Sequence, residues 1–391
     1  MLNETNKKKT NRNDKKKTNR NRLKNTQKGK SYKNVLKSDI TIKKLDINYS
    51  SDSYNVYNIP DFWLQVFEDE DRFNLLKQRL RDMMLYDVYN NVLHNQFTSE
   101  WKRNKELDLC DINKKIYHNY HYPKQNKPYQ SFNTLKMDTN TDFIHYNTIL
   151  CTCFIIIGVI GYKLKDFGID LMIKGGKALQ LASSQIKRST YISQDIDLLV
   201  VDKQKLYTLD EKQKIAYHIG KFISWILDNK DNKLSISVKE PDIHNPSIYK
   251  LSYIKSQKII DYRTGEPRNE YKAFCDIDFK DIPREINEYF ENNHIDEFYI
   301  SELNIPVLYQ YPDINNILKE KLYYTYQYLL SIKTEKDRRL INEYQRIIDK
   351  FQKQIQYIIK ILSINKKSMI KILNSLKFID NNNQLIDLLY K

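Results

Sequence analysis

The spacing of apolar residues predicts an α/β section in the middle of this chain. Residues 143–162 are apolar over most of their length and favour a buried helix, and Ile169–Ile173 is a short apolar strand. A glycine turn leads into a short helix from Ala178, and Asp195–Val201 is a second strand by its β-branched content. Helix, strand, glycine turn, helix and strand are therefore expected in that order.

The flanking regions show other patterns. Residues 60–80 and 210–228 carry apolar side chains at helical spacing, and residues 313–391 are typical of several amphipathic helices. Three strand-like runs are found at 234–238, 248–253 and 273–279. We therefore expect an α+β fold, with flanking helices on a mixed β-sheet and a helical C-terminal domain.

Pattern and composition together predict four segments. They are a basic tail at 1–35, a helical and irregular extension at 36–140, an α/β core at 141–305 and a helical domain at 306–391. The stretch 105–140 is expected to be a surface loop. His118 and His121 within it lack the neighbouring Cys or His residues that would complete a metal site.

The apolar run Phe143–Tyr162 has roughly the length of a bilayer span. His145 and Asn147 make its first third polar, and Gly158 and Gly161 interrupt the rest. We expect a buried core helix here and no membrane partner. The N-terminal sequence is rich in Lys, Asn and Thr with no apolar segment behind it, so no secretory signal is expected.

Charge is unevenly distributed along the chain. Lys and Arg number 65 against 49 Asp and Glu, which gives a net charge of +16. Residues 1–30 hold twelve of these cations and two acids, so the other 361 residues carry only about +6. The tail is either a non-specific polyanion-binding arm or a plain extension. The four Cys form no CxxC pair, which favours a reducing, intracellular setting.

Three features of the middle section need one explanation. They are the glycine pair Gly175-Gly176, the acids of Asp195-Ile196-Asp197 and the acids of Asp276-Ile277-Asp278. Residues two apart on a strand project to the same side, so each pair of acids lies side by side. Adjacent carboxylates repel each other unless a cation neutralises them, and oxygen ligands suit Mg²⁺ or Mn²⁺. Acids on neighbouring strands would form a two-ion site that supports in-line phosphoryl displacement.

The glycine pair provides room for phosphate. Glycine is scarce in this Asn-, Lys-, Ile- and Tyr-rich chain, with eight in total, so the adjacent Gly175 and Gly176 are informative. A strand that ends in Gly-Gly before a helix lets backbone N–H groups approach phosphate, and the helix N-terminus favours negative charge. The sequence contains no GxxxxGK[ST] and no GxGxxG, which excludes a P-loop and leaves a Rossmann site without support.

The segment IKGGKALQLASSQIKRSTYISQDIDLLVV resembles the signature of the DNA polymerase β-like nucleotidyltransferase superfamily. That signature is a glycine pair, a helix and then Asp alternating with apolar residues on a strand. FCDIDF resembles the superfamily's third-carboxylate strand, and Val307–Arg339 resembles the helix that follows in several members. The order of these blocks and the A/T-biased composition are most similar to poly(A) polymerase catalytic subunits of large DNA viruses.

The resemblance implies a role for each matching residue. Gly175 and Gly176 would hold the β- and γ-phosphates of the incoming nucleotide, and Asp195 and Asp197 would coordinate both metal ions. Asp276 would bind the catalytic ion and help to deprotonate the acceptor hydroxyl. Asp278 is the other candidate for this third ligand, because it lies on the same face as Asp276.

Cations would complete the triphosphate site. Lys321 would reach the triphosphate from the helical domain, and Lys336 or Arg338 would add to the positive wall. The alternative for these three is a solvated helix face. Lys177 stands where many members have Ser or Thr and could pair with phosphate as a point charge, and Gln194 stands where Ser or Thr is frequent.

The resemblance implies an enzyme of mRNA processing. It would transfer AMP from ATP to an RNA 3′ end without a template, using two Mg²⁺ or Mn²⁺ ions, in the cytoplasm or virion of a viral system. A homodimer and an accessory subunit both remain open. One alternative is a toxin-like nucleotidyltransferase that modifies tRNA or protein hydroxyls. Another is an inactive RNA-binding or scaffold subunit. The intact glycine pair and acids argue against this alternative.

Overall fold

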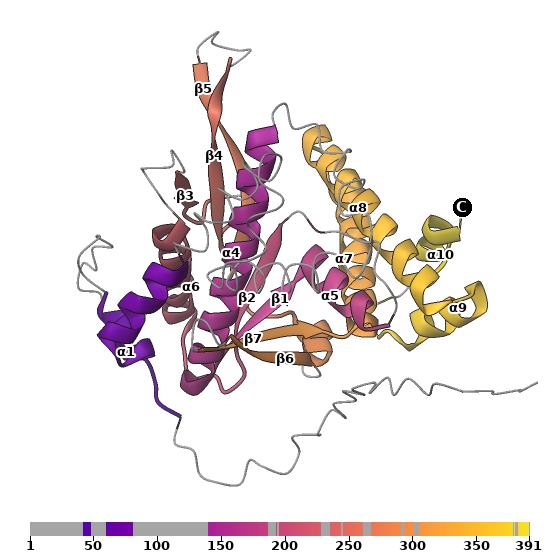
Figure 1. The fold of residues 1–391 in the computed structure, drawn as a ribbon. Helices are drawn as coiled ribbons and strands as arrows, with labels where there is room; N and C mark the ends of the chain where they lie inside the picture. The colour runs from indigo at the N-terminus through magenta and orange to yellow at the C-terminus, as the bar shows by residue number, and fades with distance from the viewer. Residues whose placement is uncertain are drawn as a thin grey trace, which may run out of the picture. The chain divides into compact units, whose positions relative to one another are not determined.

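Seven strands form one mixed β-sheet in the part of the chain that the structure describes (Figure 1). The strands are β1 (Ile169–Lys174), β2 (Ile196–Asp202), β3 (Ile236–Lys239), β4 (Ile248–Ile260), β5 (Pro267–Asp278), β6 (Asn293–Ile300) and β7 (Ile305–Pro312). Their order in the sheet is β3-β4-β5-β2-β1-β7-β6. β2 pairs with β5 and β1 with β7 in parallel, and the other four neighbouring pairs are antiparallel.

The structure is a computed structural model that describes most of the chain from Ile42 onward. The described residues are 42–47, 60–80, 140–186, 193, 195–227, 235–243, 245–260, 267–290, 293–300, 305–377, 379 and 382–390. The predicted basic tail, most of the predicted extension, the loop with His118 and His121, and Gln194 lie outside the described residues. Residues Ile42–Lys391 form one compact unit.

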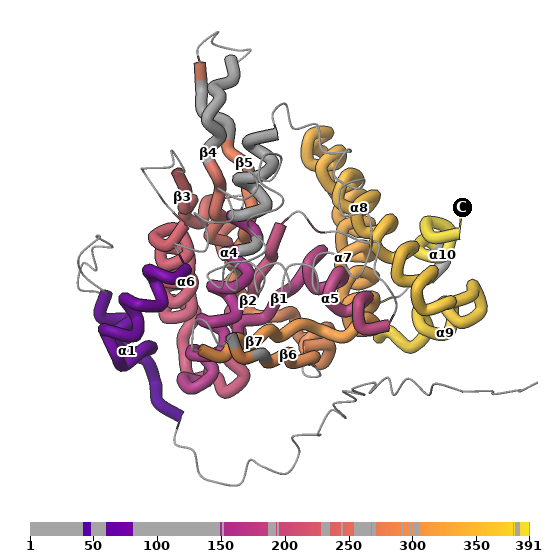
Figure 2. The backbone as a smooth tube through the Cα atoms, viewed as in Figure 1, coloured from indigo at the N-terminus to yellow at the C-terminus, as the bar shows by residue number. Residues whose placement is uncertain are grey.

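Helices flank the sheet. They are α1 (Asp61–Phe67), α4 (Asn140–Leu164), α5 (Gly175–Ile186), α6 (Leu209–Leu227), α7 (Ile314–Thr334), α8 (Arg338–Leu362), α9 (Lys366–Ser375) and α10 (Asn382–Tyr390), with the 3-10 turns η5 (Lys165–Phe167) and η6 (Arg284–Phe290). The backbone trace shows α9 and α10 next to α8 at the C-terminal end (Figure 2). The predicted α+β class, a mixed sheet with flanking helices and further helices at the C-terminus, is confirmed at this level.

The two faces of the sheet carry different side chains. Apolar residues of β2 and β5, among them Ile196, Leu198 and Ile277, are fully buried, and α6 packs over Ile277 at Gly220. The alternate residues of the same strands, Asp197 and its neighbours in register, point to the other face, where α5 packs between the sheet and helices α7 and α8 (Figure 1). Because side chains alternate along a strand, one face of the sheet is apolar and buried under α6 and the other is polar.

Helix α4 confirms the expected buried helix. Its described side chains from Ile149 to Ile160 are almost all fully buried against β1 and β7. A Cβ at Gly161 would lie 2.9 Å from the backbone oxygen of Leu308, so glycine at this position allows close contact between helix and strand. In the described part of the chain, no helix combines the length and the apolar character needed to span a membrane.

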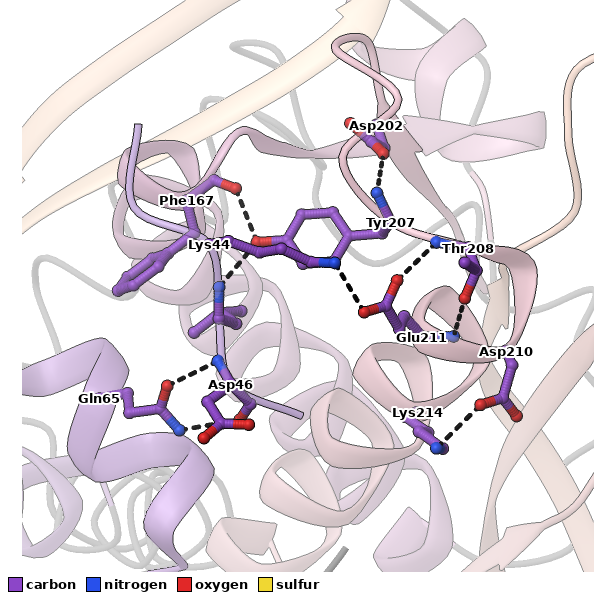
Figure 3. Close-up of polar contacts among 11 residues, drawn as sticks. Lys44, Asp46, Gln65, Phe167, Asp202, Tyr207, Thr208, Asp210, Glu211 and Lys214 are labelled. Carbon is purple, nitrogen blue, oxygen red and sulfur yellow. Dashed lines mark hydrogen bonds and ion pairs between the residues drawn. The ribbon is translucent and has the colours of Figure 1, made fainter. Parts of the chain in front are cut away.

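Residues 42–47 are tied to the rest of the unit by polar contacts (Figure 3). The backbone N–H of Leu45 donates to the hydroxyl of Tyr207 over 3.0 Å, and that hydroxyl donates to the carbonyl of Phe167 over 3.0 Å. The side chain of Gln65 accepts from the N–H of Asp46 and donates to its carbonyl. This segment therefore joins α1 to the loop between β2 and α6.

Several element boundaries differ from the predicted ones. The expected continuous helix at 60–80 is broken because Glu68 adopts a left-handed backbone with φ of 58°, and Asp69 then caps the next helical turn at Arg72. The sequence patterns also did not indicate β6 or β7. Since β7 (Ile305–Pro312) pairs with β1, the sheet continues beyond the predicted end of the core at 305.

Candidate active site

A row of charged side chains crosses the centre of the polar face. Antiparallel pairing sets Lys174 of β1 opposite Asp197 of β2, and parallel pairing sets Asp197 beside Asp276 of β5. Lys250 of β4 stands opposite Asp276. Residues in register on neighbouring strands point to the same face, with backbones about 5 Å apart. The register therefore brings together two acids that lie 79 positions apart in the sequence, between two lysines.

A cavity of about 250 Å³ opens over this row. Its floor is the polar face of the sheet with the first residues of α5, and α7 and α8 supply the opposite wall. Cations in the lining are Lys174, Lys280, Lys321 and Lys350, and aromatic residues are Phe290, Tyr324, Tyr328 and Phe351. The strands thus supply acids and Lys174 to the cavity, whereas α7 and α8 supply Lys321 and Lys350 together with most of the aromatic residues.

Gly175 sits directly against the carboxylate of Asp197. It is the first residue of α5 and has φ of +66°, a backbone conformation that L side chains rarely adopt. A Cβ at this position would lie 1.9 Å from Oδ2 of Asp197 and 3.2 Å from its Cβ. Any side chain at 175 would therefore displace the Asp197 carboxylate. Glycine at 175 therefore allows the Asp197 carboxylate to lie against the first residue of α5.

Burial raises the pKa of both acids in the row by more than the neighbouring lysines lower it. Burial and the negative charge of Asp195 raise the pKa of Asp197 to about 6, against a smaller opposite effect of Lys174. Burial also raises the pKa of Asp276, although Lys250 acts the other way. Oδ1 of Asp276 is buried and has no hydrogen-bond partner among the described residues. A cation or a proton is needed here.

Asp278 is in the opposite situation. Its Oδ2 lies 2.6 Å from Nζ of Lys174, and its Oδ1 accepts from the backbone N–H of Lys280 over 3.0 Å. Burial alone would raise its pKa, but the ammonium groups of Lys174 and Lys280 outweigh burial and hold the pKa below its usual value. Of the two candidates for the third carboxylate, Asp276 is the one with an unpartnered oxygen.

Asp195 lies just before β2 and does not line the cavity. Its Oδ1 accepts from the hydroxyl of Ser193 over 3.0 Å. Its charge still acts on both other acids, because it contributes to the raised pKa of Asp197 and of Asp276. The three acids are therefore electrostatically coupled, although only Asp197 and Asp276 line the cavity.

The donor chemistry of these acids suits a divalent cation. Only carboxylate oxygens are offered, which is the ligand type of Mg²⁺ and Mn²⁺. As the side chains lie, no three acid, imidazole or thiol groups of the described residues are close enough to hold an ion together. Asp278 forms an ion pair with Lys174, and Asp195 accepts a hydrogen bond from Ser193. The unpartnered Oδ1 of Asp276 and the raised pKa of Asp197 are what make the residues fit a cation.

The four predicted phosphate-binding cations lie in different places. Lys321 lines the cavity, is 4% exposed and has its Nζ 4.7 Å from the ring centre of Phe351. Lys177 is fully buried, with its Nζ 3.2 Å from Oε1 of Gln180, and does not line the cavity. Lys336 and Arg338, at the junction of α7 and α8, are exposed and do not line it either. Of these four cations, the structure brings only Lys321 to the cavity wall.

Other lining residues were not singled out by sequence reasoning. Lys174 directly precedes the glycine pair, and this position could have identified it as a candidate site residue. Lys280 follows β5, and Lys350 lies on α8. Tyr324 and Tyr328 are four residues apart on α7 and so share a helical face. No local pattern marked Lys350, because its place depends on how α8 packs.

Comparison with known proteins gives no relative. No protein-family model, no curated protein and no solved structure matches this chain.

Proposed function

We propose that this chain is a metal-dependent nucleotidyltransferase. It transfers a nucleoside monophosphate, AMP by resemblance, from a nucleoside triphosphate to the 3′ hydroxyl of an RNA without a template. The observation that carries the proposal is the register of β2 and β5, which sets Asp197 beside Asp276, with Gly175 against the Asp197 carboxylate.

The cavity offers complementary surfaces to the parts of a nucleotide. Lysines at 174, 280, 321 and 350 and the N-terminus of α5 favour a polyphosphate. The aromatic rings of Tyr324 and Tyr328 on the helical wall offer flat apolar surfaces to a base. A ligand that carries both a polyphosphate and a flat base therefore finds cations and aromatic rings in the same cavity.

The acids serve the transfer step. A bond forms between the acceptor oxygen and the α-phosphorus, the bond from that phosphorus to the β-phosphate oxygen breaks, and pyrophosphate leaves. The acceptor proton passes to Asp276, whose buried Oδ1 has no other described partner and whose pKa is raised. A bound Mg²⁺ or Mn²⁺ would be held by Asp197 and Asp276, which line the cavity, and would neutralise phosphate charge; by the resemblance, Asp195 would be the further ligand. Lys321 steadies the triphosphate from the helical side.

Primer extension tests the proposal. A 5′-labelled RNA primer is incubated with each NTP separately, with Mg²⁺ or Mn²⁺, and with wild-type protein or the Asp195→Ala plus Asp197→Ala double variant. The matched control carries Asp71→Ala plus Asp166→Ala, because these acids are exposed and lie outside the cavity. Wild type and control should produce a ladder with ATP, and the active-site double variant should produce none.

The other outcomes separate the alternatives. A single added nucleotide, or labelling of tRNA or protein in place of the primer, would favour the toxin-like reading. No metal-dependent incorporation from any NTP on any RNA would refute the proposal and leave an RNA-binding subunit.

A further inference from the structure

Outside the N-terminal tail, positive charge is concentrated in one segment. Residues 338–377 contain ten Lys and Arg against two acids, a net charge of +8. The whole chain carries +16 and residues 1–30 account for +10, so the remaining residues carry about −2 in sum. The excess of the folded unit therefore comes from α8, α9 and their flanks. A compositional bias toward Lys would spread along the chain and does not explain this.

All ten of these cations are exposed. Among the described residues, none of them forms an ion pair with a carboxylate, whereas lysines such as Lys174, Lys203 and Lys212 elsewhere in the unit do. Lys350 acts on Asp276 in the cavity and Lys366 lies over the ring of Tyr390, but no carboxylate of the described residues forms an ion pair with any of the ten. Ten like charges close together cost free energy unless a polyanion neutralises them.

On α8 the cations form a line. Arg339, Arg346, Lys353 and Lys360 recur every seven residues, which is about two helical turns or about 10 Å. The buried residues Ile348, Ile355 and Ile358 lie on the opposite side, because a helix advances about 100° per residue. These four cations, here termed the α8 stripe, therefore face solvent along the length of the helix.

The α8 stripe leads to the cavity. Lys350 lies one turn from both Arg346 and Lys353 and lines the cavity wall together with Phe351. A chain of phosphates lying on the stripe would thus reach the site at the middle of α8. This continuity between an exposed row of cations and the cavity distinguishes the stripe from an ordinary solvated helix face.

We propose that the α8 stripe binds the sugar-phosphate backbone of a single-stranded nucleic acid whose 3′ end enters the cavity. The identity of that strand as the acceptor rests on the proposed function; the binding itself does not. A lipid surface fits less well, because a membrane-binding helix needs a free apolar face and the apolar face of α8 is buried in the core. A single strand can bend from the stripe into the cavity, which a stiff duplex cannot do.

The test measures binding without nucleotide or metal. The full chain is titrated against a fluorescein-labelled single-stranded RNA of about 20 nucleotides, long enough to span the stripe, and anisotropy is recorded at several salt concentrations. The stripe variant carries Arg346→Gln, Lys353→Gln and Lys360→Gln. The control variant carries Lys43→Gln, Lys165→Gln and Lys205→Gln, which removes the same charge from exposed positions that do not line the cavity.

The stripe variant should bind about 50-fold more weakly at 0.15 M salt, and its salt slope should fall by about 2, since each lost phosphate contact on a single strand changes the slope by about 0.7. The control variant should bind nearly as wild type does. Equal weakening of both variants would overturn the inference. So would stripe-dependent binding to duplex DNA as tight as to RNA, or capture by anionic vesicles in place of RNA.

The two proposals fail separately. Stripe-dependent RNA binding with no primer extension would leave the inference standing and remove the proposed function. If the stripe variant bound RNA and extended the primer as wild type does, the proposed function would stand and the inference about the stripe would be overturned.

Discussion

Replacement of Gly175 by Ala tests whether the glycine turn and the acids act as one site. The new Cβ would lie 1.9 Å from Oδ2 of Asp197, far inside van der Waals contact. Rotation of the carboxylate would relieve that overlap, but the Cβ of Asp197 at 3.2 Å would remain crowded. The variant must therefore turn the carboxylate away from its position or shift the start of α5.

Two magnitudes follow from this geometry. A non-glycine residue at φ of +66° costs about 1–2 kcal/mol, and residual crowding brings the loss in unfolding free energy to about 1–3 kcal/mol. The effect on catalysis should be larger, because a catalytic group misplaced by about 1 Å can cost about 100-fold in rate. The activity should therefore fall much further than the stability.

Gly220→Ala is the matched control. A Cβ at Gly220 would meet its nearest neighbours at 3.5 Å, which is ordinary contact, and its φ is not in the left-handed region. It lies inside α6, where alanine is favoured over glycine by about 0.5–1 kcal/mol. Urea unfolding and primer extension are measured on both variants. If Gly175→Ala matched Gly220→Ala in both assays, the steric link between residue 175 and Asp197 would have no functional meaning.

Four further predictions concern single residues of the cavity and the core. In metal-free protein, the pKa of Asp197 is raised to about 6, so this residue stabilises the fold fully below about pH 4 and loses that contribution as the pH rises past 6. The unfolding free energy of Asp197→Asn, measured with urea, should therefore rise by roughly 2–3 kcal/mol relative to wild type between about pH 4 and pH 8. A difference that stays constant with pH would contradict this. Asp276→Asn should abolish primer extension with the fold intact. Asp278→Asn breaks a buried ion pair with Lys174 and should lower the unfolding free energy by about 3 kcal/mol; a stable Asp278→Asn variant would argue against that pair. Burial lowers the pKa of His218 to about 4, so its contribution to the unfolding free energy is present above about pH 6.5 and is lost as the pH falls toward 4. In thermal unfolding, His218→Phe should therefore remove up to about 3 kcal/mol of the stability that wild type loses over this pH range. An unchanged loss of stability at acid pH would refute the prediction.

Local sequence determined the unit from β1 to β2. Ile169–Ile173 and Asp195–Val201 were predicted as strands, and the structure has them as Ile169–Lys174 and Ile196–Asp202. Such elements follow from periods of two and 3.6 and from glycine's freedom at positive φ, which act within a few residues. The pattern likewise fixed that Asp276 and Asp278 share a face.

Local sequence could not choose between these two acids. The choice depends on strand register, which sets Asp276 beside Asp197, and on Lys174, which reaches across the sheet to Asp278. β7 was missed for a related reason. Its run IPVLYQYP begins and ends near prolines, which strands disfavour, and it is a strand because it pairs with both β1 and β6.

The cations show most clearly what local sequence cannot predict. Lys177 follows the glycine pair and was expected at phosphate, but α5 begins at Gly175, and two residues along a helix turn a side chain by about 200°. Lys177 is therefore buried, while Lys350, 175 positions beyond Gly175, lines the cavity. The sequence by itself determined which segments become strands and helices and which acids share a strand face, because those depend on local periodicity. Only the tertiary structure decided which charges meet, because helix phase, register and packing join residues far apart in the chain.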